Sequence, residues 1–407
     1  MNSKKITAAV LAAAMTVPLA ACSKGAEETE QIVFVTQSTV ASEETTAQTE
    51  AVQTTEPVAT QSLNPNELYD PSNPLAVNPI TGIQDMDPNN VGQRSVAVVI
   101  NNSHAAMPQR GISAADAIYE YQTEGGQTRL LAVFADVNTI PEIGSLRSAR
   151  ILSTDLAAGN NSVFIHFGRN ARVPDHISQY GIDHIDGNSC SAGVYSSSNY
   201  ADGYVDLPDG LFFWRDALWK SQRAIEHTAV TDGRHILEAI EYNEISMTNT
   251  VDNMLFNFVP GNSADLETGD PCDQINVYFS GTNPDALFTY DPLTGLYSKS
   301  QYGNPQIDET TGTQISFTNV FVLYANIQPH GDTTIDAYLE DGGEGWYVSD
   351  GRIIPITWSK SGPNSPIIVF NENGEELEVN RGRSYICIVD NDMESQTTIT
   401  SSLSNNN

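Results

Sequence analysis

Three stretches of this chain are apolar at successive positions, and they constrain the fold more than any other feature. They are Val96–Ile100, Arg129–Val137 and Val163–Phe167. Side chains of a β-strand point alternately to opposite faces, and in the second stretch both the odd and the even positions from Leu130 to Ala135 are apolar. Such strands are typical of the centre of a sheet that is covered on both faces. The sequence therefore predicts a sheet with a layer packed on each side.

Helical patterns alternate with these strands. Ser113 with Asp116 forms a capping box, which predicts a helix up to Thr123. Further helices are predicted from Ser145 or Ser148 to about Ala158, over Asp175–Tyr180 and over Thr231–Tyr242. The alternation indicates an α/β domain over residues 75–245, with a covered, mostly parallel or mixed sheet.

The texture of the sequence changes from Gln274 onward, where short aromatic and β-branched runs are separated by turn residues. This pattern predicts a smaller, mainly-β domain over residues 273–392, built as a meander or small barrel. A linker over residues 246–272 would join the two domains, and residues 393–407 would form a disordered tail. Within the β domain we expect a long strand over Val320–Ile327 and hairpins over residues 288–297, 346–353 and 366–379.

The N-terminus has the form of a signal peptide. Two lysines precede an apolar run from Ile6 to Ala21, and Leu19-Ala20-Ala21-Cys22 resembles the lipobox of bacterial lipoproteins. The resemblance implies that a signal peptide over residues 1–22 is cleaved just before Cys22. Cys22 would then be the new N-terminus, carry two acyl chains and anchor the protein on the extracytoplasmic face of the cell membrane. The alternative is an ordinary secretory signal with an incidental cysteine. Residues 23–74, rich in Thr and Glu, predict a disordered tether.

The charge balance limits the possible partners. The chain has 19 Lys and Arg against 51 Asp and Glu, a formal net charge of −32. Nucleic acid is not expected as a partner, because phosphate binding needs clustered cations. No spacing of carboxylates matches a metal-binding loop, so neither a metal nor another cofactor is predicted. Three scattered cysteines (Cys190, Cys272, Cys387) allow at most one disulfide and do not form a disulfide framework.

Arg147 and Arg150 are the most distinctive candidate ligand-binding residues. They are three residues apart at the expected start of the second helix, where the helix dipole disfavours each cation by about 0.3–1 kcal/mol. Arginines kept at such a position predict an anion beside them. The anion is either an Asp or Glu of the protein, in an internal ion-pair network, or the carboxylate or phosphate of a ligand. The sequence leaves both alternatives open.

Other polar residues would join these arginines if the three apolar strands were parallel, because ligands of open α/β sheets bind beyond the carboxyl ends of strands. Asn101 and Asn102 follow the first strand, although a simple turn explains them as well. His166 ends the third strand and is a candidate base, with a buried core histidine as the alternative. Glu124 is the second candidate catalytic group, but a parallel sheet would place it on the opposite edge. Arg215, beside Phe212–Trp214, and Arg129, at the start of the second strand, complete the candidate ligand-binding residues.

Two motifs are similar to those of a known family. They are Glu124-Gly125-Gly126-x-Thr128-Arg129 and Ile143-Gly144-x-x-Arg147-Ser148-Ala149-Arg150. Together with Val96–Asn102, Phe213–Asp216 and Gly345–Lys360 they resemble the YerB-type family of bacterial lipoproteins. The resemblance implies a lipid-anchored protein with an N-terminal α/β domain and a smaller C-terminal domain. It implies no particular activity.

No nucleophile elbow, zinc-protease motif or phosphate loop is present, so the sequence favours a binding protein over an enzyme. We expect a surface lipoprotein that binds an anionic small group, a peptide or a cell-envelope fragment through its arginines. One alternative is a hydrolase or transferase acting on envelope material, with His166 or Glu124 as acid or base. Another is an assembly factor of an envelope complex that offers only surface to a protein partner.

Overall fold

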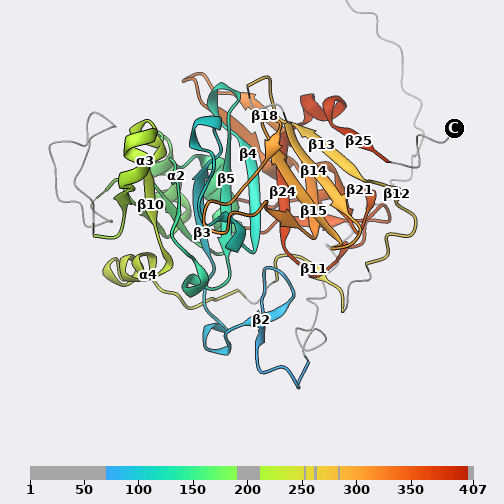
Figure 1. Cartoon of the computed structure of the whole chain (residues 1–407), viewed down its shortest axis with the longest axis horizontal. Helices are drawn as coiled ribbons and strands as arrows, with labels where there is room; N and C mark the ends of the chain where they lie inside the picture. Colours follow the sequence, from blue (N-terminus) through green and yellow to red (C-terminus); the bar gives the residue numbers. More distant parts are fainter. Residues whose placement is uncertain (1–69, 190–210, 252–253, 261–263, 283–284, 402–407) are drawn as a thin grey trace, which may run out of the picture. The chain divides into compact units, whose positions relative to one another are not determined.

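The computed structural model describes residues 70–189, 211–251, 254–260, 264–282 and 285–401 (Figure 1). The signal peptide, Cys22 and nearly all of the expected tether lie outside the described residues, as does Cys190. In the described part, no helix is both long enough and apolar enough to cross a bilayer. Cys272 and Cys387 are buried free thiols.

One large mixed sheet runs through the described chain and contains strands from both halves of the sequence (Figure 1). Its strands, in spatial order, are β12 (Asp270–Pro271), β21 (Arg352–Ser359), β20 (Gly343–Ser349), β18 (Asn319–Pro329), β24 (Ser384–Asp390), β4 (Ala117–Gln122), β5 (Thr128–Phe134), β3 (Val96–Asn101), β7 (Val163–His166) and β8 (His184–Asp186). Two further strands, β19 (Ile335–Tyr338) and β22 (Ile368–Phe370), pair with β18 and β21. The halves meet where β4 pairs in parallel with β24, with Glu120 opposite Cys387.

The sheet is covered on both faces, as the apolar runs predict. Residues of β3 point alternately into two different core clusters, with Val96 and Val98 in one and Ala97 and Val99 in the other. Helix α4 (Gly233–Tyr242) packs on the first cluster, and α1 (Ile151–Gly159) and α2 (Val173–Tyr180) pack on the second. A small sheet of β6 (Ile143–Gly144), β10 (Ala229–Thr231) and β9 (Trp214–Arg215), with α3 (Ala217–Gln222) next to β9, completes the first half.

The second half contributes a six-stranded sheet of its own. Its order is β16 (Asn304–Pro305), β15 (Leu296–Gln301), β14 (Asp285–Asp291), β13 (Gln274–Tyr278) and β25 (Thr398–Thr400), with β17 (Ser316–Phe317) beside β15. Ile275 and Phe288 of this sheet share a core cluster with Tyr385 of the large sheet. The mainly-β character of the second half is confirmed, and β13, β14 and β15 do form an antiparallel meander. The half is not a closed barrel, however, because its remaining long strands extend the sheet of the first half.

Two elements of the first half differ from the prediction. Residues 117–122 form strand β4 instead of a helix, because they lie between β5 and β24, and both neighbours supply ladder hydrogen bonds. Helix α1 begins at Ile151, so Arg147 is not in its first turn and Arg150 is its N-cap. The preceding segment is extended, since Arg147 N–H donates to Val99 O (3.0 Å) and Ala149 N–H to Gly168 O (2.9 Å).

The described residues of the expected linker and tail form more regular structure than the sequence suggests. Within residues 246–272, β11 (Asn257–Phe258) pairs in parallel with β23 (Glu378–Val379), and β12 pairs with β21. The pairing of β23 with β11 also replaces part of the third expected hairpin. After Asp390, the 3₁₀ helix η10 (Asn391–Gln396) leads into β25, which pairs with β13. Backbone pairing with distant strands orders these segments, and local composition does not reveal it.

Candidate functional site

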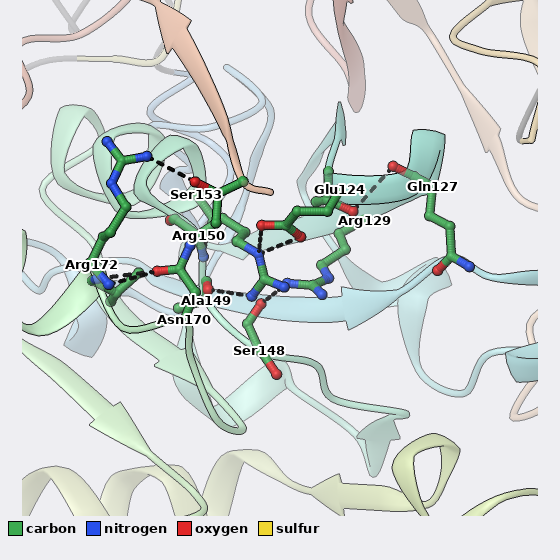
Figure 2. Close-up of polar contacts among 12 residues, drawn as sticks. Glu124, Gln127, Arg129, Ser148, Ala149, Arg150, Ser153, Asn170 and Arg172 are labelled. Carbon is green, nitrogen blue, oxygen red and sulfur yellow. Dashed lines mark hydrogen bonds and ion pairs between the residues drawn. The ribbon is translucent and has the colours of Figure 1, made fainter. Parts of the chain in front are cut away.

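Three arginine side chains lie close enough to interact electrostatically near the start of β5. Arg129 is the second residue of β5, and Arg147 and Arg150 lie on the extended segment before α1. Hydrogen bonding of this segment to β3 places it next to Arg129, which is paired with Asn101 across the antiparallel β3–β5 ladder. Figure 2 shows the guanidinium groups of Arg129 and Arg150 side by side. We call Arg129, Arg147 and Arg150 the arginine cluster.

Arg150 is neutralised by a carboxylate of the protein. Its Nε lies 2.6 and 2.7 Å from the two carboxylate oxygens of Glu124, and its Nη1 donates to Ala149 O at 2.8 Å (Figure 2). Glu124 begins the 3₁₀ turn η5 (Glu124–Gly126) between β4 and β5. If the three apolar strands were parallel, Glu124 would lie on the opposite edge of the sheet from the arginines. In the structure, β5 is antiparallel to β3. That antiparallel course brings Glu124 to the arginines.

Arg129 has no such partner. Its side chain is buried, with 8% of the residue exposed, and its Nη1 donates to the carbonyl of Ser148. It forms no ion pair with a carboxylate of the described residues. Burial first, and then the charges of Arg150 and Arg147, lower the pKa of Arg129 to about 9, while Tyr121 and Glu124 oppose the shift. A buried cation without a counter-ion costs stability unless an anion joins it.

Arg147 is half-buried and is held by a carbonyl, because its Nη1 donates to Glu226 O at 3.3 Å. Beside it, Nδ1 of His227 accepts from Asn101 Nδ2 at 2.7 Å. The orientation of the amide follows from its other bond, in which Asn101 Oδ1 accepts from Ser103 N–H. Burial, and then the charge of Arg147, lowers the pKa of His227. Neutral His227 therefore carries its proton on Nε2, which is a donor.

The cluster as a whole has an excess of positive charge. Glu124 pairs with Arg150, and the other nearby carboxylate, Glu226, lies 3.9 Å from Nε2 of His227. In a chain with a formal net charge of −32, such a local excess is unexpected. Guanidinium forks, a side-chain amide and an imidazole N–H are the groups that recognise planar oxyanions. The arrangement can hold a carboxylate or a phosphate oxygen.

Asn102 lies elsewhere, although it follows Asn101 directly. Its side chain is fully buried, and its Nδ2 donates to Glu120 Oε1 and to Thr128 Oγ1, both at 2.8 Å. Its Oδ1 accepts from Gln109 and Gln306. All of these contacts are internal, so Asn102 is positioned as part of a buried polar network instead of beside the arginine cluster.

This buried polar network connects the two halves of the chain. Glu120 of β4 lies 3.3 Å from Nζ of Lys299 in β15, and it accepts from the hydroxyl of Tyr385 in β24 at 2.6 Å. Lys299 also donates to Gln301 and to Gln306. Sequence reasoning missed Glu120 and Lys299. A charged residue inside the apolar run 117–121 would have been a signal if that run had been interpreted as a strand.

His166 is a buried histidine with both ring nitrogens occupied. Its Nδ1 donates to Gly168 O at 2.8 Å, and its Nε2 lies 3.0 Å from Nδ1 of the stacked His184. Burial lowers the pKa of His166, and burial together with the charge of a protonated His166 lowers that of His184 to about 4. Both are therefore neutral near pH 7. Within the described chain, no hydrogen bond or ion pair joins His166 to Glu124.

The contacts of Arg215 are with residues outside the arginine cluster. It donates to Ile225 O at 2.5 Å, and its guanidinium stacks over the ring of Phe167 at 4.5 Å. The adjacent Phe212 and Phe213 are buried in the core. Among the residues the structure describes, no three His, Cys, Asp or Glu side chains are grouped so that they could hold a metal ion.

Comparisons with known proteins agree with the architecture. Residues 80–246 match the N-terminal domain, and residues 275–386 the C-terminal domain, of a protein family of unknown function (DUF3048). A Bacillus subtilis (strain 168) protein named "Putative lipoprotein YerB" is 28% identical over 317 residues, which is 76% of this chain and 85% of that protein. The crystal structure of the YerB protein from Bacillus subtilis matches with a TM-score of 0.64 and 26% identity, covering 79% of this chain and 99% of that one.

The chain belongs to the YerB-type family. The predicted resemblance is thereby confirmed, together with the two-domain organisation of an N-terminal mixed sheet with helices and a mainly-β C-terminal part. The lipoprotein name belongs to the relative, and it agrees with the lipobox at Cys22. The family description names no ligand, so the chemistry of the arginine cluster must be argued from its geometry.

Proposed function

We propose that this YerB-type protein is a membrane-anchored, extracytoplasmic binding protein, and that its arginine cluster holds an anionic group of a small molecule, peptide or cell-envelope fragment. The lipobox at Cys22 and the name of the relative support the anchor. The observation that carries the binding role is Arg129, a buried cation that has only a carbonyl as its hydrogen-bond partner among the described residues. The ligand group is a carboxylate or a phosphate.

The energetics favour a ligand over a purely structural role. The pKa of Arg129 is lowered to about 9, so keeping it charged in the folded protein costs several kcal/mol near pH 7. An anion beside Arg129 and Arg147 would offset part of that cost. A structural clasp would be expected to contain its own carboxylate for each buried cation, as Glu124 is for Arg150.

The same contacts argue against acid–base catalysis by His166 and Glu124. Glu124 has both oxygens directed at Arg150 Nε, and His166 is buried with both nitrogens bonded. A general base needs a free lone pair within reach of the substrate. Binding is therefore the function that the geometry supports best.

The test is titration calorimetry of the full chain carrying Cys22→Ser, with acetate, inorganic phosphate and an N-acetyl amino acid as probes. Arg129→Gln and Arg147→Gln should each weaken binding at least tenfold. Glu124→Gln should strengthen it several-fold, because it removes the neutralising charge next to the anion. Arg234→Gln is the matched control, since Arg234 is exposed and pairs with Glu238 on α4, and it should leave affinity unchanged.

The proposal is wrong if the probes do not bind the parent chain. It is equally wrong if Arg129→Gln and Arg147→Gln bind as well as Arg234→Gln does. Thermal unfolding of each variant establishes that a loss of binding is measured on folded protein.

A further inference from the structure

A cavity lies on the large sheet in the C-terminal half, on strands other than those that carry the arginine cluster. It has a volume of about 340 Å³ and is open to solvent on one side. It spans β18, β20 and β21, the turn after β22, and η10. Its lining includes Tyr324, Glu344, Trp346, Pro355, Glu372 and Glu394. The volume is within the range of small-ligand pockets.

The lining combines an aromatic wall with carboxylates from three separate elements. Trp346 of β20 is half-buried and lies opposite Pro355 in the β20–β21 ladder. Glu344 is on β20, Glu372 on the turn after β22 and Glu394 on η10, and all three are exposed. Among the residues that the structure describes, no lysine, arginine or histidine lines the cavity. The three carboxylates give the lining a negative formal charge.

Tyr324 is a second aromatic residue of the cavity lining, and it is buried. It lines the cavity, only 3% of the residue is exposed, and burial raises the pKa of its phenol. Its hydroxyl lies close to Thr397 and Trp346 but makes no hydrogen bond of good geometry with any described residue. Tyr324 therefore contributes a second aromatic side chain to the lining, next to Trp346.

We propose that this cavity binds an organic cation, a substituted ammonium or a guanidinium group, against Trp346. A cation over an indole face is attracted by the ring quadrupole, and surrounding carboxylates add Coulomb attraction. A metal ion is a poorer fit, because the three carboxylates are not among any group of acidic side chains placed to hold one within the described residues. This site has the opposite charge preference to the arginine cluster and does not depend on it.

The experiment uses pairs of charged and neutral probes of the same shape on the full chain carrying Cys22→Ser. Choline is compared with 3,3-dimethyl-1-butanol, and N-acetyl-lysine amide with N-acetyl-norleucine amide, by calorimetry and by quenching of tryptophan fluorescence. At least one charged probe should bind saturably in the millimolar range or tighter, and its neutral counterpart at least fivefold more weakly. The two pairs distinguish a quaternary from a primary ammonium.

Two variants and a matched control complete the test. Glu344→Gln/Glu372→Gln/Glu394→Gln should weaken binding at least tenfold, and Trp346→Leu at least threefold. Glu241→Gln/Glu244→Gln/Glu267→Gln removes the same charge at exposed positions outside the cavity and should change affinity less than twofold. Equal binding of neutral and charged probes, an equal loss in the control, or displacement of the probe by equimolar Ca²⁺ would each overturn the proposal.

Discussion

The arginine cluster and the buried polar network around Glu120 both include residues of the large sheet, yet they differ in how their charges are balanced. Asn101 and Asn102, adjacent in sequence, point to opposite faces of the strand end and join one region each. In the network, Glu120 meets Lys299 and accepts from Asn102, Thr128 and Tyr385. In the cluster, Arg129 meets a carbonyl and two other cations.

The comparison shows that burial alone does not identify a functional polar group. Burial lowers the pKa of Lys299, but the charge of Glu120 opposes that effect directly. For Arg129 the charges of Arg150 and Arg147 act in the same direction as burial, and Tyr121 and Glu124 oppose it only in part. The charges of the network balance one another, so a structural role as a link between the two halves of the chain is enough to account for it. An unbalanced cluster calls for an anion that the described residues do not supply.

The largest expected effect is a loss of stability when one charge of the buried polar network is removed. Lys299→Met leaves Glu120 buried without its cation, and we expect the free energy of unfolding to fall by about 3–5 kcal/mol. Urea unfolding followed by circular dichroism measures it. The double variant Glu120→Gln/Lys299→Met removes both charges and should recover a substantial part of the loss. A loss below about 1 kcal/mol in the single variant would show that the network is not balanced by this pair.

A smaller effect separates two arginines of the cluster. Arg150→Met removes the partner of Glu124, and we expect the free energy of unfolding to fall by about 1–2 kcal/mol. Arg129→Met removes an unpaired buried cation and keeps an apolar chain in its place. It should leave stability unchanged or raise it by about 1 kcal/mol, while abolishing anion binding. If Arg129→Met destabilises as much as Arg150→Met, Arg129 is a structural residue.

The sequence predicts the covered sheet because a strand that is buried on both faces has apolar residues at successive positions, and this pattern is visible in the strand itself. Val96–Ile100 and Val163–Phe167 are apolar on both faces whatever their neighbours are. The residues of a strand do not show which other strands it pairs with. Residues 117–121 pair with residues 384–388, more than 260 positions later, and that pairing turns an apparent helix into β4 and joins the two halves. Tertiary hydrogen bonding therefore overrides a convincing capping box.

The candidate site was predictable in part. Arg147 and Arg150 stand out because two cations precede a helix, and the alternatives of an internal carboxylate and an external anion were both foreseeable. The structure gives a different environment to each member: Arg150 has Glu124, whereas Arg129 and Arg147 have carbonyls. The place of His227 beside Arg147 could not be foreseen, since 80 positions separate them and only the fold brings them together.

The smallest expected effect uses His227 to test whether an anion sits in the unbalanced region. The pKa of His227 is lowered from its usual 6.5, by burial first and then by Arg147, while Glu226 opposes the shift. A bound anion favours the protonated imidazole and raises this pKa, so by linkage anion affinity must rise as pH falls through the pKa of His227 in the complex. Sulfate remains divalent from about pH 5 to about pH 8, and we expect its affinity to increase about two- to threefold as the pH is lowered across that range.

Calorimetry at a series of pH values measures the slope of affinity against pH, and His227→Gln should abolish this slope without changing the affinity at the upper end of the range. If the parent chain shows no slope, or the variant keeps it, His227 does not face the anion, and the ligand must be held by the two arginines alone.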